Sequence, residues 1–192
     1  MKRIALLALV LASTIAVAQT NVRVRGTITG LSGDVLSVKS RDGKDVQLHL
    51  APDAAVAVAK QTTLAELKPG TYVGSAAMKR PDGTLVAKEV HTLGPQVPAG
   101  HTPWDLEPGS TMTNANLAGI VKGAGGDEIT LQYKDGSQKI LVPPGTPIIT
   151  FDQGDRSALK PGETIFTTAR DEGGKLVAQR IQVSKDGVKP AH

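Results

Sequence analysis

The 192-residue sequence predicts an all-β protein in which two small five-stranded barrels lie in tandem. The first observation is an internal duplication, because residues 26–90 are repeated in residues 119–181. The second is an alternation of apolar and polar residues with the period of two that strands show. The third is a set of Asp-Gly and Gly-Gly pairs between these runs, where hairpin turns require glycine.

The two copies share turn and core residues at a nearly constant separation. Gly26 matches Gly119, and the tetrapeptide Leu67-Lys-Pro-Gly70 matches Leu159-Lys-Pro-Gly162. The separation falls from 93 to 92 residues between these two matches, as single-residue changes in loops would produce. The shared residues are of turn and core types. The duplication therefore predicts architecture, and residues present in only one copy become the candidates for function.

Four hairpin strands are expected in each copy. Residues 46–50 and 129–133 alternate between apolar and polar side chains, which predicts strands with one buried face. Each copy also has two glycine-containing turn signals, one for each hairpin. These are Asp42-Gly43 and Asp82-Gly83 in the first copy, and Asp135-Gly136 and Gly173-Gly174 in the second.

Between its two hairpins, each copy is predicted to have a fifth extended segment and a short helical turn. Pro52 in the first copy and Pro143-Pro144 in the second interrupt pairing of the extended segment. Thr63-Leu-Ala-Glu66 has the spacing of a capping box, Pro69-Gly70 ends the turn, and residues 155–162 predict an equivalent turn. Five short strands with a helical turn after the third are typical of a small Greek-key barrel of the OB type. A simple five-stranded roll is the main rival.

Residues 92–116 join the copies and form a Pro-rich linker that is present only once. The segment carries four prolines and the only tryptophan, and it lacks a hydrophobic period. Connections of this length are usually functional or disordered, and the varied side chains favour a role in binding. We therefore predict that the linker binds a ligand or partner, with Trp104 as the anchor. The residues expected to take part are His101, Trp104, Asp105, Met112 and Asn114.

Two other interpretations of this segment remain open. Imidazole and thioether groups suit copper, and an exported chain without cysteine would have to bind it through His and Met. The metal ligands would then be His91, His101 and Met112, although their spacing follows no copper-binding motif. Trp104 would instead be structural if its indole ring docked on a barrel. Apart from copper in this alternative, we expect no cofactor.

The sequence lacks the usual catalytic arrangements, so we predict that the protein is not an enzyme. It contains no cysteine, no Gly-x-Ser-x-Gly elbow and no phosphate-binding glycine loop. Aspartates followed by glycine are explained as turn residues. A hydrolase acting on envelope polymers is a further alternative, and it would need two carboxylates about 5 to 9.5 Å apart. The acidic residues without an assigned structural role are Asp53, Asp105, Glu107, Asp152 and Asp155.

The first 18 residues have the composition of a secretory signal peptide. Lys2-Arg3 precede an apolar run that ends at Ala16-Val-Ala18, a small-x-small cleavage pattern. The apolar run is too short to span a bilayer, and a cysteine for a lipid anchor is absent. We therefore expect a periplasmic or secreted protein with no membrane insertion after cleavage.

The mature chain is expected to carry little net charge. Removing residues 1–18 takes away Lys2 and Arg3, so 22 basic residues become 20 against 18 acidic ones, a net charge of about +2. The five aromatic residues are too dispersed along the sequence to predict a stacking surface. Nucleic acid is therefore not an expected partner.

The repeated elements resemble those of an uncharacterised family of exported bacterial proteins built from small OB-like barrel domains. They are Gly-x-Ile/Val, Asp-x-x-x-Val/Leu, Asp-Gly, Leu-Lys-Pro-Gly and Leu-Val-Ala, and they cover residues 22–90 and 117–183. The resemblance implies the barrel fold and assigns no catalytic or binding residue.

Together these observations predict a non-enzymatic exported protein that acts as a binding or cell-envelope interaction module. Its expected partner is an unidentified protein or an envelope polymer. The predicted organisation is a signal peptide at residues 1–18, barrels at 22–91 and 117–184, a linker at 92–116 and a disordered tail at 185–192.

Overall fold

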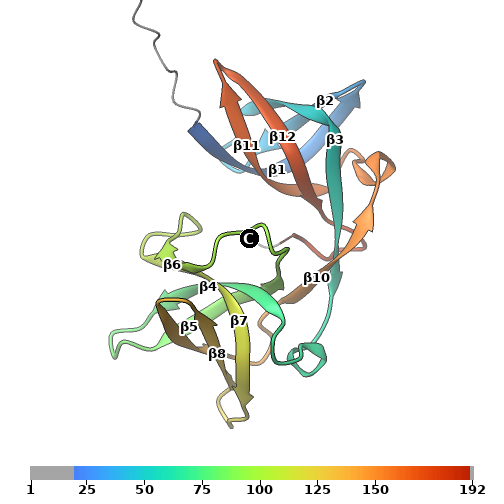
Figure 1. The fold of residues 1–192 in the computed structure, drawn as a ribbon. Helices are drawn as coiled ribbons and strands as arrows, with labels where there is room; N and C mark the ends of the chain where they lie inside the picture. Colours follow the sequence, from blue (N-terminus) through green and yellow to red (C-terminus); the bar gives the residue numbers. More distant parts are fainter. Residues whose placement is uncertain (1–19, 191–192) are drawn as a thin grey trace, which may run out of the picture.

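A computed structural model describes residues 20–190, and this part of the chain is all-β, as the sequence predicts (Figure 1). The predicted signal peptide lies outside the described residues. The strands are β1 (Thr20–Ser32), β2 (Val35–Ser40), β3 (Asp45–Gln61), β4 (Tyr72–Lys79), β5 (Leu85–Thr92), β6 (Gly100–Pro103), β7 (Ser110–Val121), β8 (Asp127–Tyr133), β9 (Gly136–Val142), β10 (Ile148–Gly154), β11 (Thr164–Glu172) and β12 (Lys175–Val183). Two 3₁₀ helices, η1 (Leu64–Glu66) and η2 (Arg156–Ala158), complete the fold.

Five strands form a closed barrel, drawn at the top of Figure 1. β1 pairs antiparallel with β2 and β11, β2 pairs with β3, and β11 pairs with β12. A parallel pairing between β12 and β3 closes the barrel, so it has no free edge. Its interior is filled by aliphatic side chains that alternate along the strands. The fully buried ones include Ile28, Leu36, Leu48, Ile181 and Val183.

Five other strands, β4, β5, β7, β8 and β9, are joined into a second ring with its own core. β4 pairs with β5 and β7, β8 pairs with β7 and β9, and all four pairings are antiparallel. A short parallel pairing, Leu85 with Ile140 and Val86 with Leu141, joins β5 to β9. The fully buried residues of this core include Val73, Val90, Leu117, Ile129 and Leu131.

Each copy of the duplicated sequence contributes strands to both groups. The first copy supplies β1, β2 and β3 to the closed barrel but β4 and β5 to the second ring. The second copy supplies β7, β8 and β9 to the second ring but β11 and β12 to the closed barrel. The expectation of two tandem barrels, each formed by one copy, is therefore not confirmed. We call this arrangement the strand exchange.

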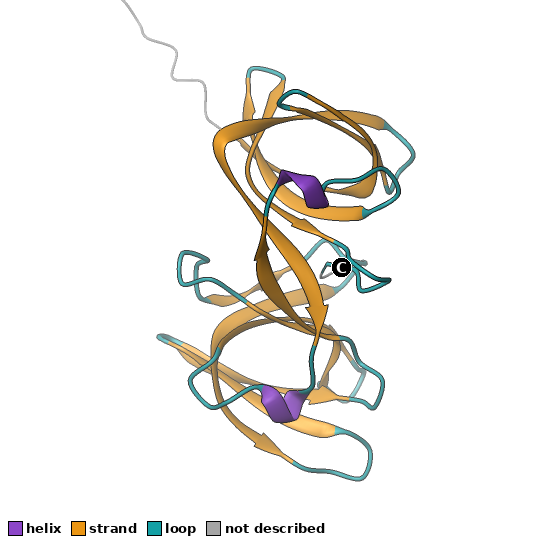
Figure 2. Cartoon of the chain, turned by 90° about the vertical axis from the view of Figure 1, so that its right-hand side faces the viewer, coloured by secondary structure: helices purple, strands orange, loops and turns teal. Residues whose placement is uncertain are grey.

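A two-stranded ribbon connects the two groups (Figure 2). The second half of β3 leaves the closed barrel and pairs antiparallel with β10, from Val56 opposite Gly154 to Gln61 opposite Ile149. As predicted, Pro52 interrupts pairing, because the register between β3 and β12 shifts after Leu50. The strand nevertheless continues to Gln61 without a turn and carries the chain out of the barrel.

The predicted helical turns are present, and they follow the strand exchange. The capping box of η1 forms, and Thr63 N donates to Glu66 Oε2 at 2.9 Å. Leu64 at the start of η1 packs in the core of the second ring. In the equivalent turn, Asp155 Oδ1 accepts a hydrogen bond from Ser157 N, and the following Leu159 packs in the closed barrel. Each helical turn thus packs in the group of strands to which the following strand belongs.

The structure also revises one sequence match. The register of β1 with β2 shifts between Ile28 and Gly30, and that of β7 with β8 shifts between Leu117 and Gly119. Gly119 is therefore the structural counterpart of Gly30 and not of Gly26. The different turns after these strands, residues 33–34 and 122–126, conceal this in the sequence.

The segment between the copies is partly built into the second ring. β6 pairs with the first half of β7, so residues 110–116, assigned to the linker from sequence, belong to a strand. Residues 185–190, expected to be a disordered tail, contain a turn paired between Lys185 and Val188, and Pro190 is buried. Residues 191–192 lie outside the described part. Between residues 20 and 190, no helix is long and apolar enough to cross a membrane.

Candidate functional site

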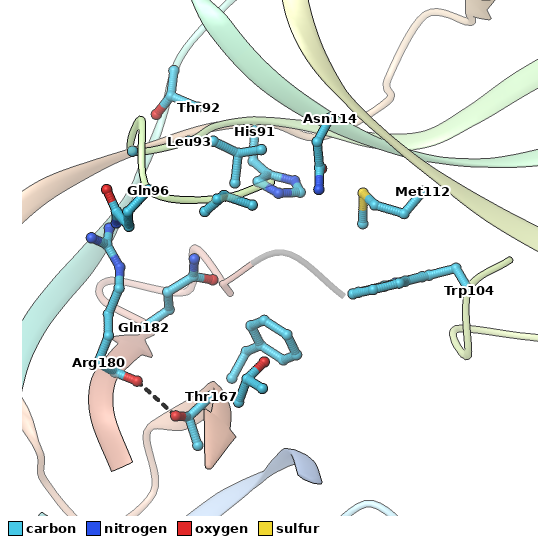
Figure 3. A pocket seen from close by; sticks show the side chains of 14 residues that line it. His91, Thr92, Leu93, Gln96, Trp104, Met112, Asn114, Thr167, Arg180 and Gln182 are labelled. Carbon is cyan, nitrogen blue, oxygen red and sulfur yellow. Dashed lines mark hydrogen bonds between the residues drawn. The ribbon is translucent and has the colours of Figure 1, made fainter. Parts of the chain in front are cut away.

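A cavity of about 250 Å³ lies between the closed barrel and the second ring. One wall comes from β5, β7 and the chain after β5, and the opposite wall comes from β11 and β12. Trp104, from the loop after β6, stands at one end (Figure 3). The cavity therefore depends on both halves of the duplicated sequence.

His91 and Asn114 form part of the wall on the second ring. Gly74, in the middle of β4, pairs with His91 on β5 and with Asn114 on β7. A Cβ atom at Gly74 would lie 2.6 Å from His91 Nε2 and 3.0 Å from Asn114 Oδ1. Glycine at this position therefore lets both side chains lean across the strand toward each other.

The opposite wall repeats this backbone arrangement with different side chains. Phe166, in the middle of β11, pairs with Arg25 on β1 and with Gln182 on β12. Each wall also has an equivalent hydrogen bond from a side chain to the backbone of the neighbouring strand. Between β4 and β5, Ser75 Oγ donates to Glu89 O at 2.9 Å, and between β11 and β12, Thr167 Oγ1 donates to Arg180 O at 2.6 Å.

The duplication therefore produces two equivalent triplets of paired residues, of which His91 and Asn114 on one side and Phe166 and Gln182 on the other line the cavity. The first triplet is Gly74, His91 and Asn114, and the second is Phe166, Gln182 and Arg25. All three positions differ between the copies, whereas the turn and core motifs are shared.

Trp104 is held against β1 by two arginines and its neighbouring aspartate. The Arg23 guanidinium lies 4.0 Å from the centroid of the indole ring, and that of Arg25 lies 5.7 Å away. Asp105 Oδ1 is 2.8 Å from Arg25 Nη2, and its Oδ2 is 3.4 Å from Arg23 Nη1. Cation–π contacts and charged hydrogen bonds thus dock the loop on the closed barrel, as the structural interpretation of Trp104 predicted.

The two arginines of this docking contact favour the charged form of the Asp105 carboxyl group. Partial burial alone would raise the pKa of its carboxyl group, but the hydrogen bond and charge of Arg25 and the charge of Arg23 outweigh it. The net effect is a pKa below the usual value for aspartate. Asp105 does not line the cavity, and its role is to hold Trp104 in place.

The structure brings together three of the five predicted binding residues. Trp104, Met112 and Asn114 line the cavity, and Asn114 Nδ2 also donates to Pro98 O at 3.2 Å. His101 lies elsewhere, with Nδ1 2.8 Å from Thr113 Oγ1. Burial, with a smaller contribution from the charge of Lys79, lowers the pKa of His101.

The proposed copper ligands are only partly brought together. His91 and Met112 line the cavity, whereas His101 does not. His91 Nδ1 lies 3.2 Å from Glu89 Oε1, and both side chains are buried. Within residues 20–190, no group of three or more His, Cys, Asp or Glu side chains is placed to hold a metal ion.

Sequence reasoning missed the wall contributed by the second copy. Phe166, Arg180 and Gln182 all line the cavity, and Gln182 is only 9% exposed. Its Oε1 atom is buried without a hydrogen-bond partner in the described part of the chain. When the two copies are aligned, Gln182 takes the position of His91. This difference between the copies was the one signal in the sequence that could have pointed to Gln182 as a site residue.

Of the unassigned carboxylates, Asp152 and Asp155 line a separate pocket beside the β3–β10 ribbon, and none lines the cavity next to Trp104. Glu107 Oε1 lies 2.9 Å from Lys88 Nζ, and Asp152 Oδ2 lies 3.6 Å from Lys60 Nζ. Asp155 caps η2. None of the residues that line the cavity is an aspartate or a glutamate.

No protein-family model, curated protein or solved structure matches the chain. The chemistry of the cavity walls is therefore the main guide to function.

Proposed function

We propose that this protein is a non-enzymatic binding module of the bacterial cell envelope, exported to the periplasm or secreted. Its ligand is a small molecule or the end of an envelope polymer, held in the cavity between the two groups of strands. The observation that carries this proposal is the position of Trp104, which lines the cavity while Arg23 and Arg25 hold it from outside. An anchored aromatic ring beside a few polar groups is typical of ligand sites.

We further propose that both groups of strands are OB-like barrels. The closed barrel follows the order β1-β2-β3-β12-β11, and the second ring follows the equivalent order β7-β8-β9-β5-β4. In each order, the third and fourth strands pair in parallel, and all other neighbours are antiparallel. This connectivity supports a five-stranded Greek-key barrel formed twice by strand exchange.

The composition of the cavity supports binding in preference to hydrolysis. Hydrolysis of a glycosidic bond requires two carboxyl groups about 5 to 9.5 Å apart across the scissile bond. The cavity walls supply amides, hydroxyls and aromatic rings but no carboxylate. These groups can orient a ligand without providing an acid and base pair.

Replacing Trp104 tests the proposed function. Native mass spectrometry of the protein recovered from its own compartment identifies the bound species, and the same measurement is made for Trp104→Ala and Trp104→Phe. We expect Trp104→Ala to lose the bound species and Trp104→Phe to retain part of it, because phenylalanine keeps an aromatic face. If Trp104→Ala remains folded and binds normally, the cavity is not the binding site. Loss of folding in Trp104→Ala alone would assign the ring a structural role.

Copper binding is a second candidate because His91 and Met112 line the same cavity. Imidazole and thioether groups are suitable ligands for Cu(I). Titration of the protein with Cu(I), beside the variants His91→Gln and Met112→Leu, tests this candidate. Binding weaker than about micromolar, or equal binding by all three proteins, would reject it.

A further inference from the structure

We infer that the cavity binds a single sugar ring that carries a carboxylate, such as a hexuronate unit of an acidic polysaccharide. This inference rests on the proposed function and specifies the ligand of the same site. It follows from the size of the cavity, the polar groups on its walls and the charge at its mouth.

The cavity has the size for one ring. Its volume of about 250 Å³ is below the range of roughly 300 to 1,000 Å³ that drug-sized ligands occupy. Trp104 and Phe166 contribute aromatic surface, and Met112 adds an adaptable thioether. Because Arg23 covers one face of the indole, a ligand ring can stack only against the opposite face. The face of C–H groups that a pyranose ring presents fits this wall.

The polar groups suit hydroxyls on the rim of such a ring. Asn114, Gln96 and Gln182 place amides on both sides of the cavity (Figure 3). An amide both donates and accepts hydrogen bonds, and so does a hydroxyl group. The buried Gln182 Oε1 atom has no partner among the described residues, so a ligand hydroxyl would satisfy an acceptor that is otherwise costly to bury.

The charge around the cavity favours an acidic ligand. Arg180 lines the cavity, is exposed, and makes no ion pair within the described part of the chain. On the Trp104 side, Arg23 and Arg25 share the single carboxylate of Asp105. Among the residues that line the cavity, Arg180 is the only Lys, Arg, Asp or Glu, so its guanidinium group gives the walls a positive charge. A guanidinium group binds a carboxylate through paired, charge-assisted hydrogen bonds.

The only tryptophan of the chain lies at this site, so its fluorescence can follow binding. The full mature chain is titrated with D-glucuronate, D-glucose, benzoate and adenosine monophosphate. We expect glucuronate to bind at least about tenfold more tightly than glucose, because its carboxylate can accept a charge-assisted hydrogen bond that glucose lacks. Benzoate and adenosine monophosphate should bind more weakly than glucuronate.

Three variants assign the contacts. Arg180→Gln should abolish the preference for glucuronate over glucose, and its backbone can still accept the Thr167 hydrogen bond. Gln182→Leu should weaken both sugars by a similar factor, because it removes a contact to hydroxyl groups. Arg41→Gln is the matched control, since Arg41 is an exposed arginine that does not line the cavity. It should leave both affinities unchanged.

The outcomes separate this inference from the proposed function. Equal affinity for glucuronate and glucose, or a preference that survives in Arg180→Gln, overturns the assignment of an acidic sugar. Tighter binding of benzoate or adenosine monophosphate overturns it as well but keeps the cavity as a ligand site. If no probe changes the fluorescence at about 10 mM, the inference fails, and native mass spectrometry still decides the proposed function independently.

Discussion

Trp104 and Asp105 are adjacent in the chain, but their side chains point to different surroundings. The indole ring lines the cavity, whereas the carboxylate turns away and binds Arg23 and Arg25 on β1. The sequence predicted both as ligand-binding residues because both belong to the segment present once. A side chain's direction depends on the docking of the loop, which the local sequence does not determine.

The Asp105 contact should make stability depend on pH. The pKa of Asp105 lies below its usual value in the folded state, so the contact stabilises the fold above about pH 4. This stabilisation is lost as the pH falls through the lowered pKa. We expect Asp105→Asn to reduce the free energy of unfolding at pH 7 by about 1 kcal/mol or less, because the carboxylate is 45% exposed.

Urea denaturation of wild type and Asp105→Asn between pH 3 and pH 7 measures this effect. The difference between the two proteins should shrink on acidification. Asp45→Asn is the matched control, because it breaks an exposed ion pair with Lys39 and should change stability little. A pH-independent difference for Asp105→Asn would contradict the assigned role of the carboxylate.

At the scale of elements, local signals predicted the hairpins and the helical turns correctly. Gly43 and Gly83 adopt positive φ angles of 81° and 91° in their turns, a conformation that glycine tolerates. Thr63 and Glu66 form the expected capping box. These features depend on residues close together in the chain. The pairing of β4 with β7, which places Asn114 opposite Gly74 and so beside His91, joins residues far apart in the chain and was not predictable.

The ribbon of β3 and β10 should be sensitive to side-chain volume at Gly154. A Cβ atom there would lie 2.5 Å from Val58 Cγ2, which is too close for a contact between carbon atoms. We expect Gly154→Ala to destabilise the protein by about 1 to 3 kcal/mol, as overpacking usually does. Thermal or urea denaturation measures this change.

The compensating variant makes this test specific. Adding Val58→Ala to Gly154→Ala removes the clashing methyl groups and should recover part of the stability. Gly119→Ala is the control, since a Cβ atom added there would have no other atom within 4 Å and the φ angle of Gly119 is not in the positive region. If the double variant is as unstable as the sum of the single variants, the ribbon contact is not the cause.

At the scale of the whole molecule, the strand exchange makes the two copies interdependent. Each group of five strands takes three from one copy and two from the other. Neither copy alone can complete the observed pairing. The cavity lies between the two groups, so its walls exist only after both have assembled.

Cleaving the connection between the copies tests this interdependence. A protease site introduced in residues 94–99, between β5 and β6, would separate the chain into its two copies. We expect the cleaved fragments to elute together in gel filtration until denaturant is added, because each group of strands contains both fragments. Cleavage outside this connection, after residue 184, is the control and should leave one intact unit. Elution of two independently folded fragments would contradict the exchange.

The sequence by itself determined that the chain is all-β, where its hairpins turn and where its helical turns lie. These properties follow from the alternation of apolar residues, from glycine in turns and from local capping. The tertiary structure alone decided which copy completes which group of strands. The two copies carry the same pairing patterns, so strands can in principle pair within a copy or between copies with similar hydrogen bonds. The unbroken course of β3 from Asp45 to Gln61 carries the first copy into the second ring, and the cavity beside Trp104 arises from that choice.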